Sequence, residues 1–114
     1  MTTGARTPEE LETLLEDTLM IGDGEALAGL FEDGAVLVAA NGLMARGVPQ
    51  IVSVALDSRH GMCSYVADPR QVMQARDIAL VVAEQGINVM RRGHDGAWRY
   101  AIAVISTRTT GEEP

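Results

Sequence analysis

Residues 78–107, with the sequence IALVVAEQGINVMRRGHDGAWRYAIAVIST, decide the fold class of this chain. Three apolar and β-branched runs, divided by a glycine break and a four-residue turn, follow one another at 78–84, 87–92 and 97–107. Helical spacing is absent from all three runs. Because connections this short join antiparallel neighbours, the stretch predicts an antiparallel meander.

The N-terminal segment carries helical signals instead. Thr7-Pro8-Glu9-Glu10 combines a capping box with proline at the first helical position, and Gly22 ends the predicted helix. Its apolar face at helical spacing comprises Leu11, Leu14, Leu15, Thr18 and Leu19. We expect a solvated face for the acidic residues that lie elsewhere, which are Glu9, Glu12, Glu16 and Asp17.

Further elements fill the chain between Gly22 and the meander. Asp23 caps a predicted second helix that Gly34 stops, with one face formed by Leu27, Leu30 and Phe31. Asn41-Gly42 is a strong hairpin signal. The remaining elements are a strand at 35–40, a return strand at 43–46, a third helix from Pro49 to before Gly61, and shorter strands at 62–66 and 70–76.

Helices followed by a run of strands make an α+β architecture. We predict three N-terminal helices packed on one face of a curved, mainly antiparallel β-sheet. At 114 residues the chain has room for one domain, which we place at 7–107, with flexible ends at 1–6 and 108–114.

Charge and cysteine content exclude several classes of function. The formal charge is -7, which disfavours a nucleic-acid partner because such binding needs clustered cations. Every one of the nine Lys and Arg positions is arginine. Residues 1–33 alone have a net charge of -8. Cys63 is the only cysteine, so neither an internal disulfide nor a cysteine-rich zinc site is expected. No apolar run approaches the roughly 18 residues of a membrane span, and residues 1–6 lack a signal region, which indicates a cytoplasmic protein without a membrane partner.

Four short motifs occur in the same order as the predicted elements. They are Gly22-Asp23 before the second helix, FEDGAV at 31–36, GLMARG at 42–47 and DGAWRY at 95–100. In these motifs and in the order of its elements, segment 7–107 resembles the nuclear transport factor 2-like superfamily, which includes ketosteroid isomerases and SnoaL-like polyketide cyclases. The resemblance implies a cone-like α+β barrel with a pocket between the helices and the concave sheet. Composition also suggests a GC-rich bacterial genome.

The resemblance also identifies polar positions that this chain has lost. Alignment places Ala39 where ketosteroid isomerase has its general-base aspartate, and Leu15 where that enzyme has a tyrosine on its first helix. Ala103, five places after Trp98, stands where many SnoaL-like relatives have a polar residue. The steroid-isomerase mechanism therefore does not carry over, and the sequence leaves open whether the protein is an enzyme.

Other polar residues are candidates for catalysis. Glu84 alternates with apolar residues, and burial there would suit it to acid–base work; alternatively it reaches solvent or pairs with an arginine. Tyr100 offers a hydroxyl and shares a strand face with Trp98, either as a pocket wall or as a core or dimer contact. The predicted pocket lining comprises Leu15, Phe31, Ala39, Tyr65, Gln74, Asn88, Trp98 and Ala103.

Two functional hypotheses follow. The first is a small-molecule-binding pocket protein resembling SnoaL-like cyclases and isomerases, which binds or acts on an apolar metabolite. The second is a non-catalytic association or ligand-binding module that kept the fold and lost the proton-transfer groups. The resemblance implies a homodimer through the open sheet face in both cases. No nucleotide, flavin or metal motif is visible, so no cofactor is expected.

Overall fold

The computed structural model describes residues 4–39, 42, 44–59, 70–83 and 86–105. The elements are, in chain order, α1 (Pro8–Ile21), α2 (Gly24–Ala28), β1 (Phe31–Ala39), β2 (Met44–Arg46), α3 (Val48–Arg59), β3 (Gln71–Ala75), β4 (Ile78–Ala83), β5 (Gly86–Arg92) and β6 (Trp98–Ile105). The predicted α+β architecture is confirmed. The strand predicted at 62–66 lies outside the described residues.

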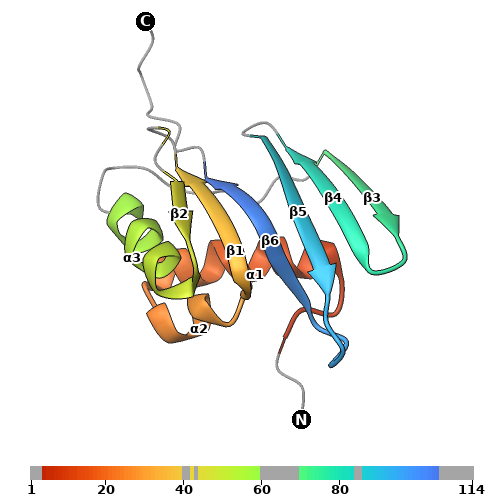
Figure 1. Cartoon of the computed structure of the whole chain (residues 1–114), viewed down its shortest axis with the longest axis horizontal. Coiled ribbons are helices and arrows are strands. Elements are labelled where there is room, and N and C mark those ends of the chain that lie inside the picture. The colour runs from red at the N-terminus through yellow and green to blue at the C-terminus, as the bar shows by residue number, and fades with distance from the viewer. Residues whose placement is uncertain (1–3, 40–41, 43, 60–69, 84–85, 106–114) are drawn as a thin grey trace, which may run out of the picture.

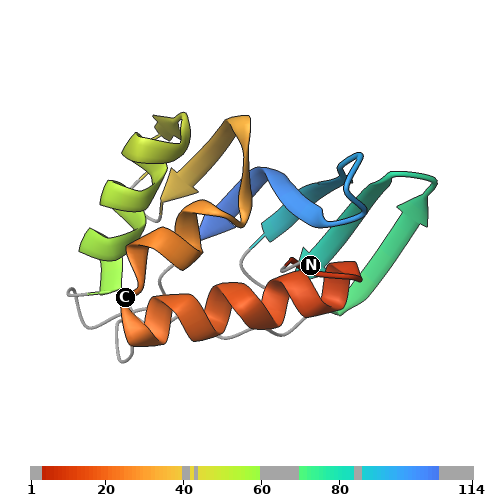
Figure 2. The same cartoon turned by 90° about the horizontal axis from the view of Figure 1, so that it is seen from below.

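The strands form a single six-stranded sheet in the order β2-β1-β6-β5-β4-β3. Strands β3 to β6 form the predicted antiparallel meander, and β1 pairs with β2 as an antiparallel hairpin. Strand β6 runs parallel to β1, so the sheet is mixed but mainly antiparallel. The strands twist and the sheet curves without closing, and α1 crosses behind β6 and β5 (Figure 1). The view turned by 90° shows α1 lying along one side of this sheet (Figure 2).

Helix α1 begins and ends at its predicted caps. The side chain of Thr7 accepts a hydrogen bond from the Glu10 backbone N–H at 3.0 Å, and Pro8 opens the helix. The Glu10 carboxylate accepts from the backbone N–H of Arg6 at 2.8 Å. At the other end Gly22 adopts a left-handed φ of 82° and donates to the Thr18 carbonyl, a conformation that costs glycine little.

The second helix is shorter than predicted. Phe31 was expected on its buried face, but it is already the first residue of β1 and pairs with Tyr100 of β6. The backbone N–H of Tyr100 donates to the Leu30 carbonyl at 2.8 Å, so pairing with a distant strand takes these residues out of the helix. Gly34, predicted to stop the helix, lies inside β1, in the stretch where the register with β6 shifts. The prediction was wrong because a long-range pairing overrides local spacing.

A single hydrophobic core lies between the helices and one face of the sheet. Its largest members include Leu11, Leu15, Leu37, Ile51, Met90, Trp98 and Tyr100. Side chains that alternate with the core residues point the other way and stay partly or fully exposed. This outer face also carries the charged residues Arg46, Arg91 and Arg99. Its apolar residues are Val36, Val38, Met44, Met73, Ile78, Leu80, Val82, Ile87, Val89, Ile102 and Val104.

The described part of the N-terminal segment is attached to the sheet at Ala5. Ala5 is buried, and its carbonyl accepts a hydrogen bond from the Trp98 backbone N–H at 2.9 Å. A side chain at Gly4 would meet the Ala97 methyl group at 2.6 Å, so the two backbones approach closely there.

Among the described residues, no helix is long and apolar enough to cross a membrane.

Candidate functional site

A glutamate of α1 faces the protein interior. Glu12 is 0% exposed, although the spacing of the leucines placed it on the solvated side. Around the helix axis Glu12 lies about 20° from Leu19 and about 60° from Leu15, and both leucines are buried. The sheet covers a wider arc of α1 than the leucine positions alone indicate. The prediction of a solvated Glu12 was therefore wrong.

Two polar side chains of the sheet converge on this glutamate. Asn88 of β5 donates from Nδ2 to Oε2 of Glu12 at 2.8 Å, and the Tyr100 hydroxyl of β6 donates to the same oxygen at 2.9 Å. Asn88 is 1% exposed and Tyr100 is fully buried. Burial of a carboxylate is costly unless hydrogen bonds replace its water, and these two donors provide that replacement. We call these three residues the interior cluster.

Asn88 is held by the sheet backbone on its other side. Its Oδ1 accepts a hydrogen bond from the backbone N–H of Val104 at 2.7 Å. The register between β5 and β6 shifts between Val89 and Met90, so the ladder is irregular close to this point. The Asn88 side chain thus accepts a hydrogen bond from the backbone of β6 through its oxygen and donates one to Glu12 of α1 through its nitrogen.

The surroundings of the interior cluster are apolar. The rings of Phe31 and Tyr100 lie 5.4 Å apart between centroids, at an interplanar angle of 34°. Leu15, Ala39 and Ala103, which the resemblance aligns with polar positions of ketosteroid isomerase and SnoaL-like proteins, are all buried. Ala103 reaches the inner face because the irregularity in β6 changes the alternation after Tyr100.

The structure brings some of the predicted site residues together and separates others. Tyr100 and Asn88 share the interior cluster. Leu15, Phe31, Trp98 and Ala103 belong to the hydrophobic core, and Ala39 is buried outside that core cluster. Gln74 is exposed on β3. The candidates Glu84 and Tyr65 lie outside the described residues, so their roles stay predictions. Glu12 was missed, and a helical projection that included every residue type would have found it.

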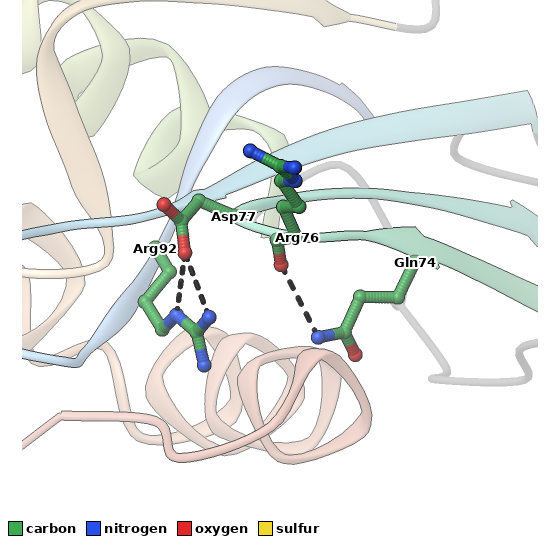
Figure 3. A network of polar contacts seen from close by, with 4 residues as sticks. All are labelled: Gln74, Arg76, Asp77 and Arg92. Carbon is green, nitrogen blue, oxygen red and sulfur yellow. Dashed lines mark hydrogen bonds and ion pairs between the residues drawn. The ribbon is translucent and has the colours of Figure 1, made fainter.

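A separate polar network occupies the surface of the β3–β4 hairpin. Arg92 donates from Nε and Nη2 to Oδ1 of Asp77 at 2.9 and 2.7 Å, and its guanidinium lies 5.4 Å from the centre of the Trp98 ring. Gln74 donates to the Arg76 carbonyl at 3.3 Å. Gln74 and Arg92 extend to one side of the hairpin, and the Arg76 side chain extends to the other (Figure 3). These contacts stabilise the hairpin rather than the interior.

An ion pair between Arg99 and Asp95 lies at the turn between β5 and β6. Arg99 donates to both carboxylate oxygens of Asp95, at 3.2 and 2.8 Å. This hydrogen bonding, with a further bond from the Ala97 backbone N–H, lowers the pKa of Asp95 to about 2. The same bond to Asp95 raises the pKa of Arg99.

In the part of the chain that the structure describes, no three His, Cys, Asp or Glu side chains gather as metal ligands.

Comparison with solved structures identifies proteins that share this fold. No family model and no curated protein matches the chain. Among solved structures, a ketosteroid isomerase-like protein from Erwinia carotovora atroseptica is 19% identical, with a TM-score of 0.66 over 82% of this chain and 88% of that one. A protein of the NTF2-like family from Streptomyces avermitilis, provisionally described as a dehydratase, is 17% identical, with a TM-score of 0.63 over 81% and 86%.

A third similar structure comes from Thiobacillus denitrificans and is provisionally described as a calcium/calmodulin-dependent protein kinase type II association domain. It is 12% identical, with a TM-score of 0.71 over 89% of this chain and 94% of that one. The chain therefore has the fold of the nuclear transport factor 2-like superfamily, as its motifs predicted. At these identities the likeness establishes the fold and no activity.

Proposed function

We propose that this protein binds an apolar small molecule in its interior, between α1 and the concave face of the sheet. The observation that carries the proposal is the interior cluster: a fully buried carboxylate, held by Asn88 and Tyr100, in an otherwise apolar core. Glutamate is rarely buried completely in proteins without a partner or a function. A few convergent polar groups within apolar walls are typical of small-molecule sites.

Glu12 is the member of this cluster that can accept a proton. A carboxylate in an apolar setting has the chemistry of a general base, and the Tyr100 hydroxyl, which donates its one hydrogen to that carboxylate, orients it. An isomerase-like or cyclase-like reaction would use these two residues, with Glu84 as the further candidate from the sequence. The fold shared with a ketosteroid isomerase-like protein is compatible with this chemistry.

Ligand titration followed by protein NMR tests this proposal. Naphthalene-sized apolar probes are expected to shift the backbone amide resonances of Glu12, Asn88 and Tyr100 and to raise the melting temperature. Amides of exposed residues such as Ile21 serve as the internal control, because surface adsorption would shift them equally. Shifts confined to the outer face, or no shift with any probe, would contradict an interior site.

We propose as a second function that the outer face associates with another copy of this chain. Among its residues Met44, Met73, Ile87 and Ile102 are each between 42% and 57% exposed. Six strands spaced by about 4.8 Å give a face roughly 24 Å wide and about 20 Å long. In projection that is about 480 Å², so the face alone supplies a smaller interface than the approximately 800 Å² per partner that standard specific interfaces bury. Exposed apolar surface of this extent is typical of an interaction site.

Sedimentation at micromolar concentration tests the dimer. The wild-type protein is expected to sediment as a dimer, and Ile102→Arg is expected to yield monomers because it places a charge in the middle of the outer face. Ile21→Arg is the matched control, since Ile21 is 73% exposed on α1, away from the outer face. A wild-type monomer, or equal effects of the two variants, would refute association through this face.

A further inference from the structure

One edge of the sheet can accept a further strand. Strand β3 is the last in the order β2-β1-β6-β5-β4-β3, and in the part of the chain that the structure describes no strand pairs with its other side. Figure 1 shows β3 at the rim of the sheet, beyond β4. We propose that this open edge of β3 binds an extended segment of a partner protein, with acidic residues at the ends of that segment, as an additional strand. The inference depends neither on the interior cluster nor on the association of the outer face.

The backbone groups at the open edge belong to Val72 and Gln74. Successive residues of a strand direct their N–H and C=O groups to opposite sides. The backbone N–H of Arg92 on β5 donates to the Asp77 carbonyl at 2.8 Å, so Asp77 faces β5 and the next residue, Ile78, faces β3. Every second residue of β4 from Ile78 onward therefore bonds to β3. Their partners in β3 alternate in the same way, which leaves Val72 and Gln74 to offer one donor and one acceptor each to an added strand.

Strand β3 lacks the features that usually protect an edge strand. Natural edges carry charged side chains or proline, or are very short. Residues 71–75 have the sequence QVMQA, with neither a charge nor a proline, and four of the five are exposed. The opposite edge strand, β2, is three residues long and includes Arg46. Because the main-chain hydrogen bonds of an added strand supply much of its affinity, β3 is the edge suited to strand addition.

The charges beside β3 indicate what kind of strand fits. Arg70 precedes β3 and Arg76 follows it. The Arg76 side chain extends away from the other polar contacts of the hairpin (Figure 3), and among the described residues no carboxylate forms an ion pair with it. Full-length antiparallel pairing with a second copy, centred on Met73, would place Arg70 opposite Arg76 of that copy, and parallel pairing would place each arginine opposite itself. Like charges opposite each other are destabilising, so acidic ends fit the open edge better than a second copy.

The two sides of an added strand would meet different surroundings. On the outer side the strand would lie beside Met73, which is 45% exposed and pairs with Leu80 of the apolar outer face. On the other side it would lie beside Val72, which packs partly against the core, and Gln74. Apolar side chains next to Met73 would extend the apolar pairing across the strands. The partner segment is therefore extended, apolar on one side and acidic at its ends.

Two designed peptides test the inference on the full chain. Both have valines on one side of an extended strand and threonines on the other; one ends in aspartate on both sides and the other in lysine. Amide hydrogen exchange is followed by NMR. We expect the aspartate-ended peptide at saturation to slow the exchange of the Val72 and Gln74 amides by about tenfold or more. The Met73 amide, which faces β4, should change little. The lysine-ended peptide is expected to bind several-fold more weakly at low salt.

Matched variants separate the backbone contribution from the charge. Gln74→Pro removes an N–H that faces the open edge and keeps the bonds of β3 to β4, so we expect it to weaken the affinity for the aspartate-ended peptide by about tenfold or more. Gln74→Ala removes the same side chain but keeps the N–H, and should bind like the wild-type protein. Arg76→Glu is expected to reverse the preference between the two peptides. Arg46→Glu, on the opposite edge strand, should leave that preference unchanged.

Several outcomes would overturn the proposal. Absence of binding, or binding without slower exchange at Val72 and Gln74, rules out strand addition at β3, as does full affinity in Gln74→Pro. Equal affinity for the two peptides rules out selection of an acidic segment. Slow exchange at Val72 and Gln74 in the protein alone, increasing with its concentration, would show that a second copy occupies the edge instead. If Gln74→Pro does not fold, the exchange pattern of the wild-type protein decides.

Discussion

Replacing Tyr100 by phenylalanine removes one hydroxyl from the interior cluster and little else. The ring keeps its contact with Phe31, whose centroid lies 5.4 Å away, but Glu12 loses the 2.9 Å hydrogen bond to its buried oxygen. A hydrogen bond to a charged group contributes about 1.5–3 kcal/mol to the free energy of unfolding. For a domain of this length, a loss of that size lowers the melting temperature by about 6–12 °C.

The assay is reversible urea unfolding of the wild-type protein, Tyr100→Phe, Glu12→Gln and the double variant. The hydroxyl acts on the Glu12 carboxylate, so the two substitutions should couple by about 1 kcal/mol or more in the double-mutant cycle. If Tyr100→Phe costs less than about 0.5 kcal/mol, or costs the same in the Glu12→Gln background, the hydrogen bond does not stabilise the buried carboxylate.

Three further predictions concern the surface. Because the Asp95 pKa is lowered to about 2, the Asp95–Arg99 pair contributes stability above the ordinary aspartate pKa of 3.8, and that contribution is lost as the pH falls toward 2. Urea midpoints at pH 5 and pH 2.5 should therefore differ less for Asp95→Asn than for the wild-type protein, and an equal difference would refute this. Arg76 has a left-handed φ of 57°, so Arg76→Asn should raise stability by about 0.5 kcal/mol in urea unfolding, and destabilisation would contradict the strain. Thr7→Ala removes the N-cap of α1 and should cost about 1 kcal/mol, with Thr13→Ala on the exposed face as the control.

Local signals predicted the elements of this fold well wherever the partner of a residue lies close in the chain. The cap at Thr7 and the left-handed Gly22 depend on neighbours within about four residues, and the paired residues of β4 and β5 lie at most 13 positions apart. The second helix was predicted too long because Phe31 is held by Tyr100, far along the chain. In β6 a strict alternation from Tyr100 would have placed Ala103 on the outer face, but the irregular register returns Ala103 to the inner face, where it was expected among the pocket-lining residues.

The candidate site was predicted in part. Asn88 and Tyr100 were recognised as strand residues whose side chains can face the interior, and the structure joins them. Their common partner Glu12 was predicted to be exposed to solvent, because a glutamate among leucines is normally placed on the polar face of a helix when no partner is known. Seventy-six and 88 residues separate Glu12 from its two donors. Helical spacing from Leu19 could have placed Glu12 on the buried face, but local spacing contains nothing that identifies partners so far along the chain.

The sequence by itself determined the α+β class, the helix caps, the antiparallel meander and the resemblance to the nuclear transport factor 2-like fold, because periodicity and turn chemistry act over a few residues. Only the tertiary structure decided that β1 lies parallel to β6 and that an acidic residue of α1 belongs to the core. The physical reason is the cost of burying a charge. Burial of Glu12 on α1 requires hydrogen-bond donors, and the folded sheet supplies them by bringing Asn88 of β5 and Tyr100 of β6 next to its carboxylate.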